Sequence, residues 1–83
     1  MRSFGFLIGA AASRQLLELS AAEQWHAFRA IEILAEHPFT TGLPHWEAEG
    51  GRTNYLRRVL DCSLTFSIDH AERTVRVLEI QFI

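Results

Sequence analysis

The sequence contains a single cysteine, Cys62, and no lysine among its 83 residues. One cysteine cannot form an internal disulfide, and no CxxC pair provides the usual ligands of a zinc site. A chain of this kind fits a reducing compartment, so we expect a cytoplasmic protein that carries no metal or other cofactor. No apolar run approaches the ~20 residues that a membrane-spanning helix needs, and we therefore expect no membrane partner.

Positive charge is also scarce. All eight basic residues are arginine, ten residues are acidic, and the formal net charge is −2. A mildly acidic domain is not typical of proteins that bind nucleic acid broadly, because these need a basic surface. Guanidinium groups nevertheless hold phosphate or carboxylate through two parallel hydrogen bonds. The alternative is that they are solvated strand residues that limit aggregation. Five arginines lie from residue 52 onward: Arg52, Arg57, Arg58, Arg73 and Arg76.

The N-terminus allows two interpretations. Arg2 and the apolar and small residues that follow it resemble a short signal peptide. Against export, Phe4, Phe6 and Ile8 alternate as in a buried strand, and no cysteine framework follows. We favour a single domain over residues 1–83. A chain this short buries only about 60% of its unfolded surface, so a partner is one way to stabilise its core.

The first half predicts one strand and two helices. The strand is expected over residues 3–8 and the first helix over residues 11–19. Ser20 and Glu23 form a capping box that begins a second helix at residue 21. Pro38 disfavours helical geometry at the residue before it, so this helix should end near residue 36. Its expected buried face consists of Ala27, Phe28, Ile31, Leu34 and Ala35. Ile33 falls among polar residues, either as an isolated exposed side chain or as part of a partner surface.

The second half predicts a loop and three strands. Residues 39–51 carry three of the five glycines and are expected to form a loop. Strands follow over residues 52–59, 62–69 and 74–82, with turns between them. In the middle one, Cys62, Leu64 and Phe66 alternate with polar residues, so one face should be buried and the other wet. The last strand changes parity, which either a central strand covered differently along its length or a bulge near Leu78 would explain. The predicted class is α+β, with two helices packed on a small, mostly antiparallel, four-stranded sheet.

A family resemblance becomes visible in the β-α-α-β-β-β order and in residues 54–69. The segment NYLRRVLDCSLTFSID resembles the core of RelE/ParE-type toxins, which typically read LYRLRVGDYRVIYEID there. Upstream, ILAEHP at residues 33–38 is similar to the LAENP helix end of that family. Downstream, residues 74–80 are similar to its closing strand. The resemblance covers nearly the whole chain through distributed matches.

The resemblance implies the toxin of a type II toxin–antitoxin module, and hence a hetero-oligomer with a cognate antitoxin. In the RelE branch the toxin cleaves mRNA on the ribosome through a basic and aromatic cluster. In the ParE branch it poisons DNA gyrase without being a nuclease. Ribosome-dependent mRNA cleavage is the activity we expect first. A gyrase inhibitor, or a degenerate toxin that only binds antitoxin, is the alternative. A plain interaction domain outside the family is the third interpretation.

The candidate catalytic residues are Arg52, Arg57, Arg58 and Arg76. Of the positions that the family usually keeps basic, Arg58 matches, but Leu56 and Ser63 stand where basic residues are expected. The family's closing strand runs into a basic pair, whereas this chain has Phe82 and Ile83. The charge that would stabilise a cleavage transition state is thus largely missing, which predicts an incomplete catalytic set.

The remaining chemically capable side chains suggest structural roles. Cys62 alternates with core residues and is expected to be buried rather than nucleophilic. Asp61 and Asp69 occupy turn positions where a carboxylate bonds to nearby backbone. Tyr55 is either a core aromatic or a platform for stacking a base, and we favour the core. The histidines lack metal-ligand spacing, although His45, in a loop close to an arginine-bearing strand, could serve as a general acid or base.

Overall fold

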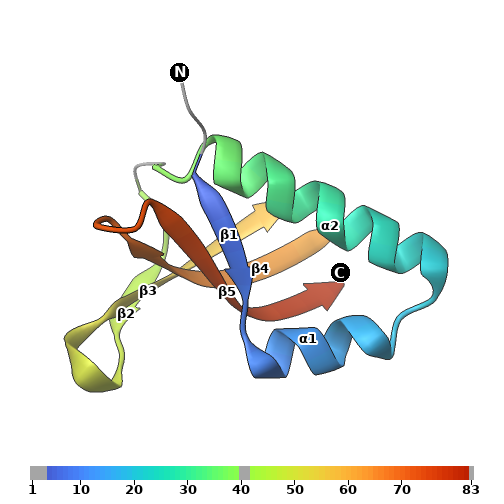
Figure 1. Cartoon of the computed structure of the whole chain (residues 1–83), viewed down its shortest axis with the longest axis horizontal. Helices are drawn as coiled ribbons and strands as arrows, with labels where there is room; N and C mark the ends of the chain where they lie inside the picture. Colours follow the sequence, from blue (N-terminus) through green and yellow to red (C-terminus); the bar gives the residue numbers. More distant parts are fainter. Residues whose placement is uncertain (1–3, 40–41, 83) are drawn as a thin grey trace.

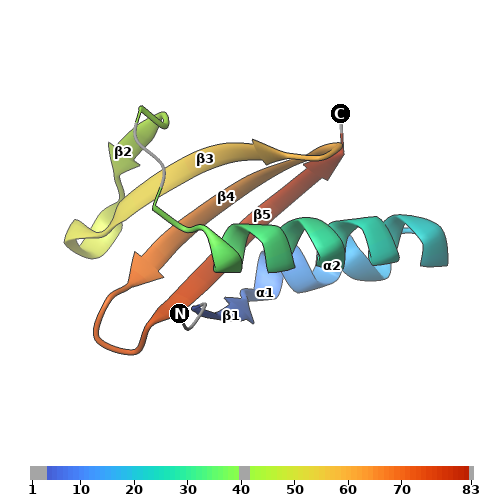
Figure 2. The same ribbon diagram turned by 90° about the horizontal axis from the view of Figure 1, so that it is seen from above.

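The computed structural model describes residues 4–39 and 42–82. Ser3 and Ile83, which the expected first strand and the apolar C-terminus include, lie outside the described residues. Two helices lie on one face of a mixed sheet (Figures 1 and 2). The predicted α+β class is confirmed. In chain order the elements are β1 (Gly5–Ile8), α1 (Ala10–Leu17), α2 (Ala21–Glu36), β2 (His45–Glu47), a 3₁₀ turn (Glu49–Gly51), β3 (Thr53–Val59), β4 (Cys62–Asp69) and β5 (Thr74–Phe82).

The sheet has five strands in the order β1-β5-β4-β3-β2. β1 runs parallel to β5 and the other neighbours are antiparallel, so the mostly antiparallel sheet is confirmed. The expected count of four strands is wrong, because β2 forms within the segment predicted to be a loop. Gly50 and Gly51 have φ angles of 81° and 77°, which allow a tight reversal. This reversal folds β2 back onto the start of β3.

The capping box determines where α2 begins. The Ser20 hydroxyl accepts a hydrogen bond from the Glu23 N–H at 3.2 Å, and a Glu23 carboxylate oxygen accepts one from the Ser20 N–H at 3.0 Å. The predicted bounds of α2 are confirmed. α1 ends two residues earlier than expected, because Ser20 must be extended to act as the cap. The Gln24 side chain then donates to the Leu16 carbonyl at 2.8 Å, which satisfies the end of α1.

The core lies between the helices and the face of the sheet that they cover. Cys62, Leu64 and Phe66 are completely buried there, as their alternation predicts. On α2 the buried residues are Ala27, Ala30, Ile31, Leu34 and Ala35. Phe28, expected in this face, is 41% exposed, and Ile33, expected outside it, packs partly against the core.

A bulge at Leu78, one of the two explanations for the change of parity, keeps β5 in register with the core. Thr65 pairs with Glu79 and Phe66 pairs with Val77, so Leu78 has no partner on β4. The extra residue shifts the alternation by one position. Val77 and Ile80 therefore both reach the buried face although three positions separate them.

The other face of the sheet has no described helix over it, and we call it the open face. Strand pairing places polar and charged side chains here, because cross-strand partners point to the same side. The open-face residues used below are Leu56 and Arg58 of β3, Ser63 and Ser67 of β4, and Arg76 of β5.

Candidate functional site

A pocket forms where β3 and β4 separate. The two strands pair from Val59 and Cys62, beside their turn, as far as Tyr55 and Phe66. Before Tyr55, β3 pairs with β2, whereas β4 continues alongside β5 to Asp69. The two strands meet at one end and diverge at the other in Figure 2. The divergence opens a pocket of about 340 Å³ between the start of β3 and the end of β4.

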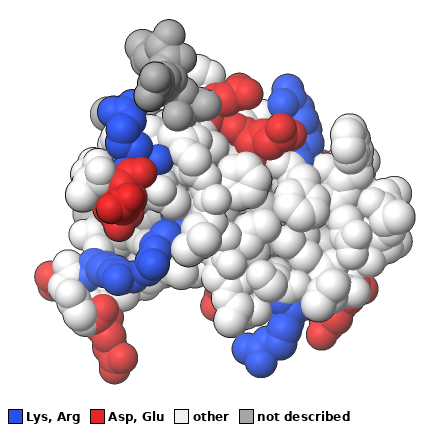
Figure 3. All heavy atoms as spheres, in the orientation of Figure 1, with Lys and Arg blue, Asp and Glu red and all other residues white. Residues whose placement is uncertain are grey.

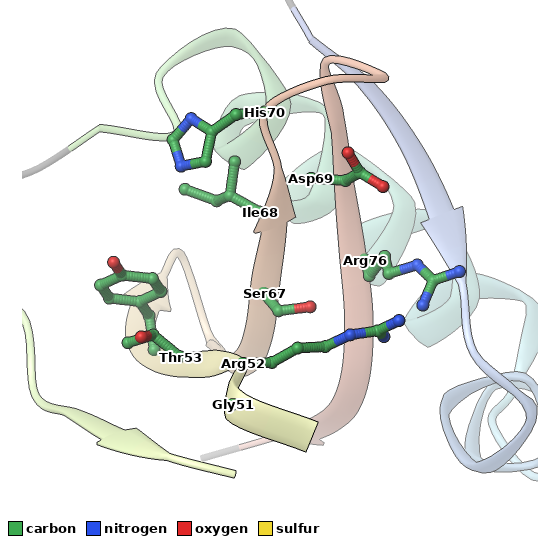
Figure 4. Close-up of a pocket in the computed structure, with 9 residues that line it drawn as sticks. Gly51, Arg52, Thr53, Ser67, Ile68, Asp69, His70 and Arg76 are labelled. Atoms are coloured by element: carbon green, nitrogen blue, oxygen red, sulfur yellow. The ribbon is translucent and has the colours of Figure 1, made fainter. Parts of the chain in front are cut away.

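Two of the four candidate arginines line this pocket. Arg52 comes from the turn before β3, and Arg76 comes from the middle of β5. Figure 4 shows the Arg52 side chain running past Ser67, and both guanidinium groups lie on the far side of Ser67 from His70. Ser67 pairs with Arg76 across the strands. The lining consists of Gly51, Arg52, Thr53, Tyr55, Ser67, Ile68, Asp69, His70 and Arg76.

The end of β4 contributes Asp69 and His70. The Asp69 Oδ1 accepts a hydrogen bond from the Glu72 N–H at 3.0 Å, which confirms the expected turn role of this carboxylate. The exposed His70 ring stacks on Phe39, with 5.6 Å between centroids and 20° between planes. Phe39 in turn meets Phe4 edge to face at 5.2 Å. No local pattern placed His70 in the site, because Arg52 and Thr53, which also line the pocket, are separated from it in the chain by β3 and β4.

Tyr55 lines the pocket at the point where the two strands part. Its ring stacks on the buried Phe66, with centroids 5.5 Å apart, and lies against the tilted ring of His45 at 6.0 Å. These contacts support the core interpretation of Tyr55 over the base-stacking one. His45 is exposed in β2, and its Nδ1 lies 3.1 Å from the Leu43 carbonyl oxygen. It does not line the pocket.

The other two candidate arginines lie elsewhere. Arg57 points to the helix-covered face, where its Nη1 donates to the His37 carbonyl oxygen at 2.6 Å. His37 is the C-terminal cap of α2, so this cation satisfies a free carbonyl and complements the helix dipole. Arg58 is exposed on the open face, directly across from Ser63.

The positions that match the family's basic residues gather near the β3–β4 turn, which we call the hairpin end of the open face. Leu56 is directly opposite Thr65, and Arg58 is directly opposite Ser63, which also pairs with Gln81. Arg58 is the cation that these matched positions retain. The fold thus brings Leu56, Arg58 and Ser63 close together, and of these three side chains Arg58 alone is positively charged.

Cys62 is completely buried and belongs to the core, as expected. Burial raises the pKa of its thiol, and the charge of Asp61 raises it further, so the reactive thiolate is disfavoured. Among residues 4–39 and 42–82, no three His, Cys, Asp or Glu side chains cluster closely enough to hold a metal ion. None of the helices in this part of the chain combines the length and apolarity that a membrane crossing requires.

No family model matches the sequence, and no curated protein matches it significantly. Solved structures do match the fold. An archaeal RelE–RelB complex from Pyrococcus horikoshii OT3 contains a chain with 17% identity and a TM-score of 0.70, and the match covers 98% of this chain and 96% of that one.

Two further complexes agree. The RelBE2 toxin–antitoxin complex of Mycobacterium tuberculosis gives 21% identity and a TM-score of 0.79, covering 100% of this chain and 94% of that chain. The intact RelBE complex of E. coli gives 11% identity and a TM-score of 0.71, and the match covers 98% of this chain and 98% of that chain. The resemblance predicted from the sequence is therefore confirmed in three dimensions: the chain has the fold of the RelE-type toxins.

Proposed function

We propose that this protein is the toxin of a type II toxin–antitoxin pair and is neutralised by a cognate antitoxin. The observation that carries the proposal is the match in fold over at least 94% of three chains solved in RelE–RelB or RelBE complexes. Because the match extends over nearly the full length of both chains, the likeness is one of whole domains and not of a single shared motif. Identity of 11–21% leaves the activity to be argued from this chain's own residues.

Apolar surface on the helical side supports a protein partner. Leu17 is 79% exposed and Trp25 is 74% exposed, and Phe28 lies one turn further along α2. Figure 3 shows charged side chains around the rim of this face and an uncharged region in its middle, between α1 and α2. Exposed large apolar residues rimmed by charge are typical of interaction surfaces. An antitoxin segment that covers them would also enlarge the small core.

For the activity, we propose weak ribosome-dependent mRNA cleavage from an incomplete catalytic set. Arg58 remains at the hairpin end, but Ser63 and Leu56 cannot supply the positive charge that a cleaved phosphodiester develops. The same poverty of charge favours the alternative of a gyrase inhibitor or a degenerate toxin that only binds antitoxin. Two further candidate arginines, Arg52 and Arg76, line the pocket instead.

The antitoxin pairing is tested by co-expression with the product of the adjacent open reading frame. We expect a co-purifying complex with a melting temperature above that of the chain alone, because a ligand of the native state stabilises it. Trp25→Ala should weaken the complex, while Arg29→Ala on the same helix serves as the control. A stable chain that gains nothing from the neighbouring product would contradict the pairing.

The activity is tested by induced expression. A ribosome-dependent nuclease should stop translation and leave cuts in ribosome-bound mRNA, and Arg58→Ala should relieve growth arrest without unfolding the protein. A gyrase inhibitor should instead cause supercoiling defects while translation continues. Ser63→Arg, combined with a basic extension after residue 83, should raise cleavage about tenfold if missing charge is the limitation. No cleavage on translating ribosomes by either version would remove the enzymatic proposal and leave the binding one.

A further inference from the structure

The sheet ends on one side at β1, and this edge is exposed. β1 is an outer strand whose neighbour in the sheet is β5. In Figure 2 it lies at the lower margin of the molecule, and neither helix is drawn outside it. Phe6 is 40% exposed and Leu7 is 51% exposed, while Ile8 is half-buried. Apolar side chains therefore stand at the margin of the sheet, where another chain could reach them.

The hydrogen bonds of β1 show which of its backbone groups point outward. The Gly5 and Gly9 N–H groups donate to carbonyl oxygens in and just before β5, at 3.0 and 2.8 Å. Alternate residues of a strand bond to the same neighbour, so Leu7 also turns its backbone groups toward β5. Phe6 and Ile8 then turn theirs outward. Among residues 4–39 and 42–82, no backbone group outside the ladder bonds to either of them.

This edge lacks the charges and prolines by which sheets usually prevent pairing with another chain. Phe6, Leu7 and Ile8 are uncharged, and the whole strand reads GFLI. The opposite edge, β2, carries Glu47 and His45 instead. β1 is short, so pairing is limited to its last three residues. Within those three, nothing opposes the addition of a further strand.

A second copy of this chain fits the edge because the edge is complementary to itself. A two-fold axis at Leu7 pairs Phe6 of each copy with Ile8 of the other, and each pair exchanges two hydrogen bonds. Leu7 then faces its own counterpart at the non-hydrogen-bonded position, with Cα atoms about 4.5 Å apart. All of these contacts are apolar. Each copy has a formal charge of −2, so two copies repel each other except where the surface carries little charge.

We propose that this chain forms a symmetric dimer through antiparallel pairing of β1 with β1 of a second copy. The two five-stranded sheets then join into one continuous sheet. Three residues on each side make a small interface, so the dimer is reversible and its population rises with protein concentration. It requires neither an antitoxin nor a ribosome, and it goes beyond the function proposed above.

The first experiment measures the monomer–dimer equilibrium of the purified full chain by sedimentation equilibrium over a series of concentrations. Leu7→Lys should raise the dissociation constant at least about tenfold, because it places two like charges opposite each other across the axis. Leu17→Lys makes the same change at a 79% exposed position on α1, and as the matched control it should leave the constant unchanged. Far-UV circular dichroism of both variants should match that of the wild type.

The second experiment tests the register and tolerates any loss of stability in Leu7→Lys. Residues that face each other at a non-hydrogen-bonded position are close enough for a disulfide. Leu7→Cys should therefore give a covalent dimer on a non-reducing gel after treatment with oxidised glutathione. Cys62 is completely buried, so the wild type should give none. Leu17→Cys is the control for random collision and should cross-link far more slowly.

Three outcomes would overturn the proposal. The wild type could be monomeric at every concentration, or Leu17→Lys could disperse the dimer while Leu7→Lys does not. Leu7→Cys could also cross-link no faster than Leu17→Cys. Antitoxin binding and mRNA cleavage play no part in these measurements, so the dimer can stand where the proposed function fails, and the reverse.

Discussion

The two ends of the open face carry arginine in different settings. At the hairpin end the strands stay paired, and Arg58 projects into solvent beside Leu56 and Ser63. At the pocket end the strands diverge, and Arg52 and Arg76 line one hollow. Where the strands are paired, a side chain is surrounded only by its neighbours along the strand and by its partners across the strands. Where strands part, residues distant in sequence can converge, so charge gathers at the pocket end although the matched family positions lie at the other.

The largest expected effect concerns the core beneath the pocket end. Phe66 is completely buried and stacks under Tyr55 at the last pair that joins β3 to β4. Phe66→Ala should lower the free energy of unfolding by about 3–5 kcal/mol, through lost burial and the cavity left behind. Chemical denaturation would measure the loss.

The matched control lies at the hairpin end of the same strand. Ser63→Ala should change the free energy of unfolding by no more than about 0.5 kcal/mol, since it removes one half-exposed hydroxyl. Equal losses in the two variants would show that the pocket end has no special dependence on Phe66.

Arg57 and Arg58 are adjacent in sequence but face opposite sides of the sheet. Arg57→Ala should destabilise the protein by about 1–2 kcal/mol, because the His37 carbonyl at the end of α2 loses its charged donor. Arg58→Ala should stay within about 0.5 kcal/mol. Thermal or urea unfolding of both variants would check this difference. If Arg57→Ala proved neutral in stability yet abolished activity, the assignment of Arg57 as a structural residue would be wrong.

The turns at the two ends offer a smaller contrast. Leu60, beside the hairpin end, and Arg73, in the turn beyond the pocket, have φ angles of 56° and 50°. A left-handed conformation costs most residues about 1–2 kcal/mol, and glycine recovers part of this at an entropic cost. Leu60→Gly should therefore stabilise the protein by about 0.5 kcal/mol. Arg73→Gly should not, because the Arg73 guanidinium lies over the Phe4 ring at 4.9 Å. A gain of the same size for Arg73→Gly in urea unfolding would count against that packing.

The smallest expected effect is a pH dependence of stability that arises at the start of α2 and involves neither end of the open face. The Ser20 N–H, and then its hydroxyl, hold the pKa of Glu23 below its ordinary value of 4.5. A lowered folded pKa adds stability above 4.5 and loses it as the pH falls through the folded value. Glu23→Gln should therefore be slightly less stable at neutral pH and lose less on acidification. Denaturation curves from pH 7 to pH 3 that run parallel in both proteins would contradict this.

Local patterns in the sequence were sufficient for much of the fold. The capping box predicts where α2 starts, because both of its hydrogen bonds form within four residues. The alternation of Cys62, Leu64 and Phe66 predicts the buried face. The parity change in β5 left two explanations open, and the bulge at Leu78 is the one that the structure has. β2 was missed because a three-residue strand carries too little periodicity to be recognised.

The candidate site was only half predictable. Arg52 and Arg76 were identified as cations that could bind phosphate, but so was Arg57, which the fold turns toward α2. His70 was read as a turn residue, although it lines the pocket. Residue type shows which chemistry is available, but not which side chains share a cavity.

By itself the sequence determined the α+β class, the helix cap, the buried alternation and the resemblance to RelE-type toxins, because each depends on neighbouring residues or on their order. Only the tertiary structure decided that β3 leaves β4 at Tyr55 and that Arg52 and Arg76 line the same pocket. Strand divergence depends on which edge β2 pairs with, and that pairing is a competition among segments across the whole sheet. The energy of such long-range pairing is not contained in any short stretch of the chain.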